Sequence, residues 1–386
     1  MQLTVATRHL RPVGAALCAA ALLSLRHAGG AVLPEDRGDI LYHRYSGGGI
    51  EIQGPSITVR QGLGDAWSFS GNYYVDSISG ASIDVVTTAS PYTEKRTEYS
   101  VSADYLRGEH ILSGGYKTSS ENDYQAETAW FSASQDMFGD LTTVTIGFSY
   151  GRDTVGMSTD PDFAEPASHR TWSVGLSQIL TRDLIAAFNW DTVSDEGFLN
   201  NPYRSVRYLD PDSPIGYAYQ PERYPRTRTS NAAGIKLRYY LPGRAALGAQ
   251  YRYFTDTWGI RADTVELSYT HPFRDRWRLD LRYRYYDQNR ADFYSDLFPR
   301  QDAQNYLARD KELSTFSDYT LGFGLSYEFT RKGWGFIDRG SLNFKYDRIR
   351  FDYKDFRDLT AGGTPGTEPL YTLDADVIQA FVSLWY

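Results

Sequence analysis

Charged residues recur at every second position in one stretch of the second half of the chain. Arg278, Asp280, Arg282 and Arg284 alternate with apolar residues, and in a β-strand such positions share one face. If that face lines a water-filled pore, its guanidinium groups favour anions. The same charges could instead pair with acidic neighbours and stiffen a filled interior, and the sequence leaves both interpretations open. We predict a pore-lining basic strip of Lys236, Arg238, Arg252, Arg278, Arg282 and Arg284, with Asp280, Glu328 and Asp347 as its acidic partners.

A Gly-Phe-Ser-Tyr-Gly run at residues 147–151 matches the G-x-S-x-G pattern of hydrolase nucleophiles. That motif requires a sharp strand-to-helix turn that exposes the serine. Here Phe148 and Tyr150 continue a strand-like alternation, and Ser149 falls on the polar face. We therefore interpret the match as chance, predict no catalytic residue and do not expect an enzyme.

Metal-binding patterns are weak. The histidines show no zinc-type spacing; they are His9, His27, His43, His110, His169 and His271. Asp160, Asp162 and Glu165, and separately Asp210 and Asp212, could supply oxygen ligands to a divalent cation. Asp-Pro is also ordinary turn chemistry in exposed loops, and we favour that interpretation. No metal and no cofactor is expected.

The element that identifies the fold class is the last stretch, residues 374–386. Its apolar row has period two, which predicts a strand with one apolar face; the row consists of Ile378, Ala380, Val382, Leu384 and Tyr386. An edge strand of a soluble sandwich is the alternative. A terminal strand that ends on an aromatic residue is typical of outer-membrane barrels. We predict that Val382, Leu384 and Tyr386 form a C-terminal signal for the barrel-assembly machinery.

The same alternation recurs along the chain in a rhythm of strand, short turn, strand and long connection. Expected long connections cover residues 78–95, 154–167, 194–226, 289–312 and 354–373. Short turns on one side and long loops on the other indicate a bacterial outer-membrane barrel with periplasmic turns and extracellular loops. We predict an all-β fold, a single antiparallel transmembrane β-barrel of about 16 strands, with 14 as the other possible count.

Composition agrees with that fold class. The chain has 386 residues, of which 31 are Tyr and 34 Gly, a usage that favours strands and turns. Its negative mean hydropathy excludes a helical membrane protein but not a barrel, whose strands alternate with a polar interior. The net charge of −8, without a basic tail or domain, predicts no nucleic-acid partner.

The N-terminus predicts export. Arg8, His9 and Arg11 precede an apolar run from Val13 to Leu25, the pattern of a secretory signal peptide. We expect a signal peptide at residues 1–31 and an outer-membrane barrel at residues 32–386, located in the bacterial outer membrane. Because the single cysteine lies inside the expected signal, the mature chain needs no disulfide.

Three segments carry a family resemblance. They are Leu33–Arg37, Ala81–Tyr92 and Ser134–Thr143, and they resemble an uncharacterised family of Gram-negative outer-membrane β-barrels, the domain of unknown function 3570. The resemblance implies a barrel surrounded by outer-membrane lipid, with no assigned substrate or catalytic residue. It also implies a role alongside extracytoplasmic redox proteins, with a periplasmic or lipoprotein partner.

These observations predict a channel for small polar or anionic solutes. The alternative is a non-conducting barrel that acts as a scaffold for a periplasmic or lipoprotein redox partner. The apolar segment 81–92 is predicted either to fold inward and line the pore, or to be an apolar loop or a strand extension without that role.

Overall fold

The computed structural model describes residues 31–80, 92–330 and 333–386. Apart from Ala31, the expected signal peptide lies outside these residues, as does nearly all of the segment that we predict to fold inward. Within the described parts, no helix is long and apolar enough to cross a membrane.

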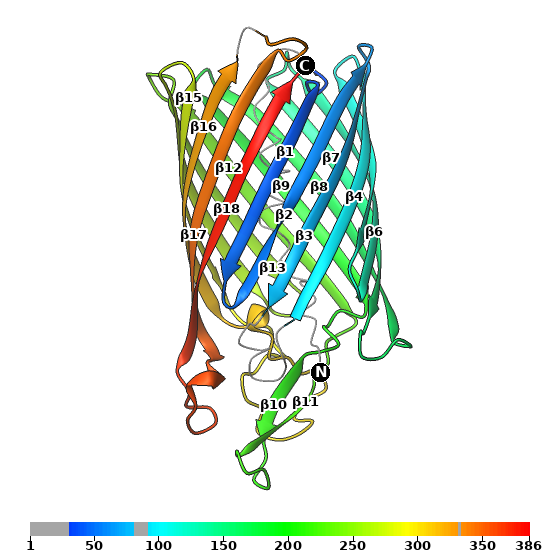
Figure 1. Cartoon of the computed structure of the whole chain (residues 1–386), viewed down its shortest axis with the longest axis vertical. Helices are drawn as coiled ribbons and strands as arrows, with labels where there is room; N and C mark the ends of the chain where they lie inside the picture. The colour runs from blue at the N-terminus through cyan, green and yellow to red at the C-terminus, as the bar shows by residue number, and fades with distance from the viewer. Residues whose placement is uncertain (1–30, 81–91, 331–332) are drawn as a thin grey trace.

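Sixteen antiparallel strands form a closed barrel (Figure 1), which confirms the predicted fold class and strand number. The first nine are β1 (Arg37–Gly47), β2 (Ile50–Leu63), β3 (Trp67–Gly80), β4 (Tyr92–Arg107), β5 (His110–Ser120), β6 (Tyr124–Met137), β7 (Thr142–Gly156), β8 (Ala164–Thr181) and β9 (Leu184–Gly197). The other seven are β12 (Thr227–Tyr240), β13 (Ala246–Asp256), β14 (Arg261–Phe273), β15 (Trp277–Gln288), β16 (Phe316–Thr330), β17 (Arg339–Arg357) and β18 (Leu370–Trp385). A hairpin of β10 (Ser205–Leu209) and β11 (Tyr217–Pro221) and two 3-10 turns, η1 (Lys311–Leu313) and η2 (Leu359–Ala361), lie outside the ring.

The ring closes between its first and last strands. β1 pairs with β18 from Arg37 opposite Trp385 to Gly47 opposite Ala375. Closure satisfies the backbone groups at both edges of the sheet, which a lipid environment requires. The C-terminal stretch that identifies the fold class therefore also seals the barrel.

The outer face carries the apolar rows. Phe69, Val101, Ile146, Leu267 and Leu321 are all exposed on it, as expected for side chains that face lipid. Aromatic pairs mark both ends of this band; they are Trp67–Tyr105 and Trp277–Tyr327 near the periplasmic turns, and Tyr73–Tyr99 and Tyr285–Tyr319 near the opposite end. Such girdles form at the two membrane interfaces.

The longest connections lie at the end predicted to be extracellular, but the connections after β1, β5 and β13 at that end are short, and several strands are longer than expected. β8 has 18 residues and β17 has 19, whereas about 10 tilted residues cross a bilayer. The bounds correct the predicted connections, because β3 continues to Gly80, β4 begins at Tyr92 and β17 continues to Arg357. Beyond the membrane both faces of a strand are wet, so the period-two pattern fades while the backbone pairing continues.

Candidate functional site

The predicted basic strip lies on the inner face of the barrel. Lys236 and Arg238 are on β12 and Arg252 is on β13, while Arg278, Arg282 and Arg284 share β15. Their neighbours Ile235, Leu237, Leu281 and Tyr283 are exposed on the outer face, and strand alternation then directs the charged row inward.

The arginines of β15 are paired. Arg282 contacts the Asp347 carboxylate of β17 at 2.8 Å and that of Glu266 at 3.9 Å. Arg278 contacts Asp280 at 3.0 Å, and Arg284 contacts Asp318 at 2.9 Å. These contacts support the interpretation of an ion-pair network that stiffens the inner wall.

The strip on β12 and β13 differs from that on β15. Within the described parts of the chain, neither Lys236 nor Arg238 forms an ion pair. Arg252 lies over the Phe254 ring at 5.7 Å, and its register partner is Gly234, two residues from Lys236. Lys236 and Arg238 therefore concentrate positive charge on this side of the lumen. On β15 the Arg278 side chain, next to the periplasmic turn, is 52% exposed, so solvent reaches the inner wall at that end.

Two acidic partners were missed by the sequence analysis, and the structure places the predicted partner Glu328 two residues beyond Ser326, the register partner of Arg278. Glu266 and Asp318 point inward because their neighbours Val265 and Tyr319 point outward. The alternation in the sequence was therefore sufficient to predict that both acids face the lumen. Glu328 lies beyond the residues of β16 that pair with β15, opposite Ser341 of β17. The structure thus joins Asp280 and Asp347 to the strip and places Glu328 at the periplasmic end.

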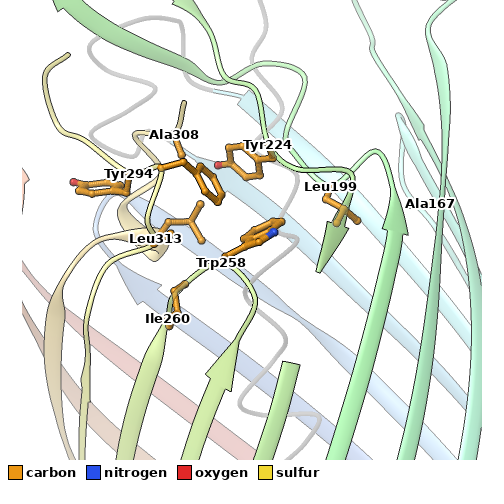
Figure 2. Close-up of a cluster of buried hydrophobic side chains, with 10 residues drawn as sticks. Ala167, Leu199, Tyr224, Trp258, Ile260, Tyr294, Ala308 and Leu313 are labelled. Atoms are coloured by element: carbon orange, nitrogen blue, oxygen red, sulfur yellow. The ribbon is translucent and has the colours of Figure 1, made fainter. Parts of the chain in front are cut away.

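Three extracellular connections fold together into a compact unit, which we call the cap. It comprises residues 198–226, 289–315 and 358–369. Its apolar part is shown in Figure 2, where Tyr224 and Leu313 approach Trp258 of the short β13–β14 connection. The Trp258 ring lies 5.5 Å from that of Tyr224 and 5.2 Å from that of Phe293. Loops that bury aromatic residues in this way are folded structure rather than exposed tethers.

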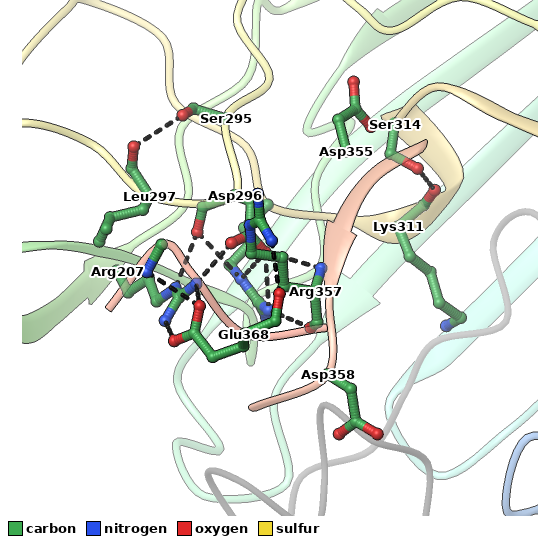
Figure 3. A network of polar contacts seen from close by, with 12 residues as sticks. Arg207, Ser295, Asp296, Leu297, Lys311, Ser314, Asp355, Arg357, Asp358 and Glu368 are labelled. Carbon is green, nitrogen blue, oxygen red and sulfur yellow. Dashed lines mark hydrogen bonds and ion pairs between the residues drawn. The ribbon is translucent and has the colours of Figure 1, made fainter. Parts of the chain in front are cut away.

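A buried ion network holds the cap together (Figure 3). Arg207 is 0% exposed, and its guanidinium contacts Glu368 Oε1 and Asp296 Oδ2, both at 2.5 Å. The second oxygen of Asp296 accepts from Arg309 Nε at 3.1 Å, and the Arg309 backbone N–H donates to Glu222 at 2.7 Å. Each carboxylate is paired and hydrogen-bonded, which a buried charge requires.

The cap lies across the mouth of the barrel. Tyr203 donates a hydrogen bond to Asp123 in the β5–β6 connection at 2.5 Å, while Arg207 binds Glu368 in the β17–β18 connection. On the shorter way round the ring, those two connections are separated by six strands, namely β5, β4, β3, β2, β1 and β18. The segment from Tyr203 to Arg207 therefore connects two parts of the rim that are six strands apart round the ring.

The cap carboxylates have shifted proton affinities. Burial raises the pKa of Glu222 above its usual range, with Arg204 acting in the opposite direction. Burial also raises the pKa of Tyr224 well above its ordinary value. For Glu368, burial favours the neutral acid, but the hydrogen bond from Arg207 outweighs it and lowers the pKa. A depressed carboxyl pKa stabilises the fold above the unfolded pKa of about 4.3, and the contribution is lost as pH falls through the folded pKa.

A further carboxylate group lies at the rim, and the sequence analysis did not identify it. Glu94, Glu121 and Asp123 each place an oxygen atom within 4.8 Å of the others. Burial raises the pKa of Glu121 to about 7, opposed by Arg96 and assisted by Asp123. No local spacing could reveal this group, because residue 94 meets residues 121–123 only through the pairing of β4 with β5.

The sites considered in the sequence behave as ordinary structure. Asp160 accepts from the Asp162 backbone N–H at 3.2 Å, and Asp210 accepts from that of Asp212 at 3.1 Å, which is turn chemistry. Ser149 lies within β7 and has no strand-to-helix turn. His169 contacts Asp153 and Asp195, each at 2.6 Å.

Solved outer-membrane structures resemble the chain at low identity. The siderophore receptor PirA from Pseudomonas aeruginosa is 12% identical with a TM-score of 0.42, and the match covers 92% of this chain and 64% of the receptor. The chain thus spans about two thirds of that receptor's length. A bacterial polysaccharide outer-membrane secretin is 9% identical with a TM-score of 0.49, covering 92% and 100% of the two chains. The CymD monoaromatic hydrocarbon channel is 8% identical with a TM-score of 0.43, covering 92% and 89%.

No curated protein matches the sequence. One family profile matches residues 83–170 and 164–338, which together span well over half of the chain. That family is described as "Protein of unknown function (DUF3570)". The sixteen-stranded barrel of this chain, with its lipid-facing rows and aromatic girdles, is the architecture of a bacterial outer-membrane protein, and the chain belongs to the DUF3570 family.

Proposed function

We propose that the protein is a pore for small polar or anionic solutes. The observation that carries this proposal is the charged inner wall, where Lys236 and Arg238 add positive charge beside the paired arginines of β15. Barrels of sixteen to eighteen strands are wide enough to leave an aqueous channel. Charged rings inside such a channel select ions by sign. Ser149 has no catalytic part in this proposal.

The cap gives this pore an entrance filter. Because it spans the mouth and is held by a buried network around Arg207, solutes pass around the cap or only after it moves. Small polar solutes are therefore favoured over large ones. This entrance also explains why the longest loops fold into one unit instead of remaining separate.

Single-channel recording tests the proposal directly. The full mature chain is inserted into a planar bilayer separating two KCl concentrations. We expect stable steps of small conductance and a reversal potential on the anion-selective side. The heat-dependent gel shift shows whether the barrel is folded. If a folded and inserted barrel gives no conductance steps, the pore proposal is wrong.

A scaffold is the second candidate, and one observation favours it. Trp334 and Phe336, in the longest periplasmic connection, are 74% and 80% exposed. Exposed aromatic residues of this kind are enriched where proteins bind partners. If no conductance is recorded, the scaffold is tested by capturing a periplasmic or lipoprotein partner with the barrel. Binding that is lost when Trp334→Ser and Phe336→Ser are introduced supports the scaffold.

Assembly of the barrel is proposed to depend on its last residue. Tyr386 completes the outward row with Val382 and Leu384, and its hydroxyl donates to the Arg60 carbonyl at 2.9 Å. Deleting Tyr386 removes the aromatic end that we expect the assembly machinery to read, so the amount of folded barrel in outer membranes should fall several-fold. Quantitative blots of heated and unheated membranes measure this. Tyr240→Ala, an exposed aromatic at another periplasmic strand end, is the control, and equal losses in both variants would contradict the signal.

A further inference from the structure

The carboxylate group at the rim brings together two parts of the barrel. Glu94 lies near the extracellular start of β4, and Glu121 and Asp123 form the ends of the three-residue connection between β5 and β6. The residues are 3% exposed for Glu94 and 8% for Asp123, and the Glu121 side chain is 6% exposed. Three acids with ligand atoms within 4.8 Å of one another are thus shielded from bulk water.

Among the residues that the structure describes, two oxygens of this group have no hydrogen-bond partner. Glu94 uses Oε1 to accept from the Asn122 backbone N–H at 3.2 Å, and Asp123 uses Oδ2 to accept from the Tyr203 hydroxyl at 2.5 Å. The remaining oxygens, Glu94 Oε2 and Asp123 Oδ1, are fully buried and unpartnered among the described residues. Buried polar atoms in native proteins are almost always satisfied, so these two indicate a bound group.

The charge of the group is also unbalanced. Arg96 is the neighbouring cation, with Nε at 3.9 Å from Glu121 Oε1. Arg96 is already engaged by Glu98 at 2.9 Å and by the Ser119 hydroxyl at 3.1 Å. One shared guanidinium against three close carboxylates leaves an excess of negative charge in a poorly solvated place, which is costly unless the group takes up protons or binds a cation.

We propose that Glu94, Glu121 and Asp123 bind one divalent cation, with Ca²⁺ as the best fit. All ligands are carboxylate oxygens at irregular positions, which suits the flexible coordination of Ca²⁺. Zn²⁺ prefers nitrogen and sulfur ligands, and Mg²⁺ demands near-ideal octahedral geometry. Water or backbone carbonyls complete the shell.

The site is coupled to the cap through one residue. Asp123 offers Oδ1 to the cation and Oδ2 to Tyr203, and Tyr203 belongs to the cap segment 198–226. Since its single proton goes to Asp123, the Tyr203 hydroxyl accepts from the Ser158 backbone N–H at 2.5 Å and from the Ser158 hydroxyl at 3.0 Å. A cation that fixes the Asp123 side chain therefore holds the acceptor that anchors the cap on this side of the rim.

Calorimetric titration with CaCl₂ tests the proposal on the full mature barrel, refolded in detergent without lipopolysaccharide and freed of metal by a chelator. We expect one Ca²⁺ per chain, with a dissociation constant on the order of 0.1–1 mM, the range of extracellular calcium modules. Glu94→Gln and Asp123→Asn should each weaken binding at least tenfold. Asp160→Asn, which changes an exposed turn aspartate, should bind as the parent does. Absence of saturable binding in the folded parent, or unchanged binding in both site variants, overturns the site.

A second measurement separates the site from its coupling. Cleavage of the cap segment by a broad protease should accelerate several-fold when the chelator replaces Ca²⁺. Tyr203→Phe should bind Ca²⁺ like the parent but lose this calcium protection, whereas protection that survives in Tyr203→Phe overturns the coupling. Neither the titration nor the proteolysis requires conduction. The cation-site proposal can therefore be contradicted while the pore proposal is supported, and the pore proposal can be contradicted while the cation-site proposal is supported.

Discussion

Replacing Arg207 by methionine should release the cap while leaving the barrel folded. The substitution leaves the buried Glu368 carboxylate without the guanidinium that contacts it at 2.5 Å, and leaves Asp296 with Arg309 alone. Removing one partner of a buried ion pair costs about 3–5 kcal/mol. That cost is comparable to the whole stability of a unit as small as the cap. We expect rapid proteolysis within residues 198–226 and a several-fold rise in single-channel conductance, with the gel shift of the folded barrel unchanged.

The matched control is Arg223→Met. Arg223 belongs to the same cap segment and contacts Asp302 at 2.6 Å, but its side chain is 49% exposed. Exposed pairs contribute about 0–1 kcal/mol, so protease resistance and conductance should stay close to those of the parent. If Arg207→Met is as resistant as Arg223→Met, the buried network does not hold the cap.

Neutralising the arginines of β15 should shift the selectivity of the lumen toward cations. The triple change of Arg278, Arg282 and Arg284 to Gln removes three positive charges and leaves their partners Asp280, Asp347 and Asp318 in place. An inner wall with those carboxylates uncompensated attracts cations. The ratio of anion to cation permeability, read from the reversal potential across a KCl gradient, should fall several-fold.

The control for this change lies on the other face of the wall. Arg348 and Arg350 of β17 share the outward row with Phe344, and Arg348 pairs with Asp374 and Asp376 at the outer surface. Arg348→Gln with Arg350→Gln should leave the reversal potential unchanged. A conducting triple variant with the parent's permeability ratio would mean that β15 does not set selectivity.

The barrel could be predicted because its physics is local. Alternation of the kind seen from Tyr319 to Phe329 predicts which residues face lipid, and an even number of strands places both ends of the sheet on the same side of the membrane. The same parity predicts that Lys236 and Arg282 lie on the inner wall. Ion pairs between strands need the register as well, and the register depends on turns whose length the sequence gives only roughly. Asp318 and Glu266 were missed for that reason.

The cap could not be predicted, because no period marks it. Arg207 and Glu368 are 161 positions apart in the chain, and each resembles an ordinary charge of a soluble loop. The available signal was the unusual density of aromatic residues in the connection after β9, among them Tyr203, Tyr217 and Tyr224. Side chains of that size are rarely left in solvent in such number, so they could have indicated a buried interface. Which residues these aromatic side chains pack against is visible only in the structure.

The long separations within the cap also fix an order of assembly. Arg207 must find Asp296 at 89 positions and Glu368 at 161, contacts whose loop-closure entropy is large in an open chain. Once the strands from β9 to β18 are paired, the sheet holds all three connections at one rim and the search becomes local. Pairing of these strands therefore precedes cap formation, and a chain stalled during insertion presents an uncapped mouth. A protease that cleaves the cap segment would then report on unfinished barrels and spare finished ones.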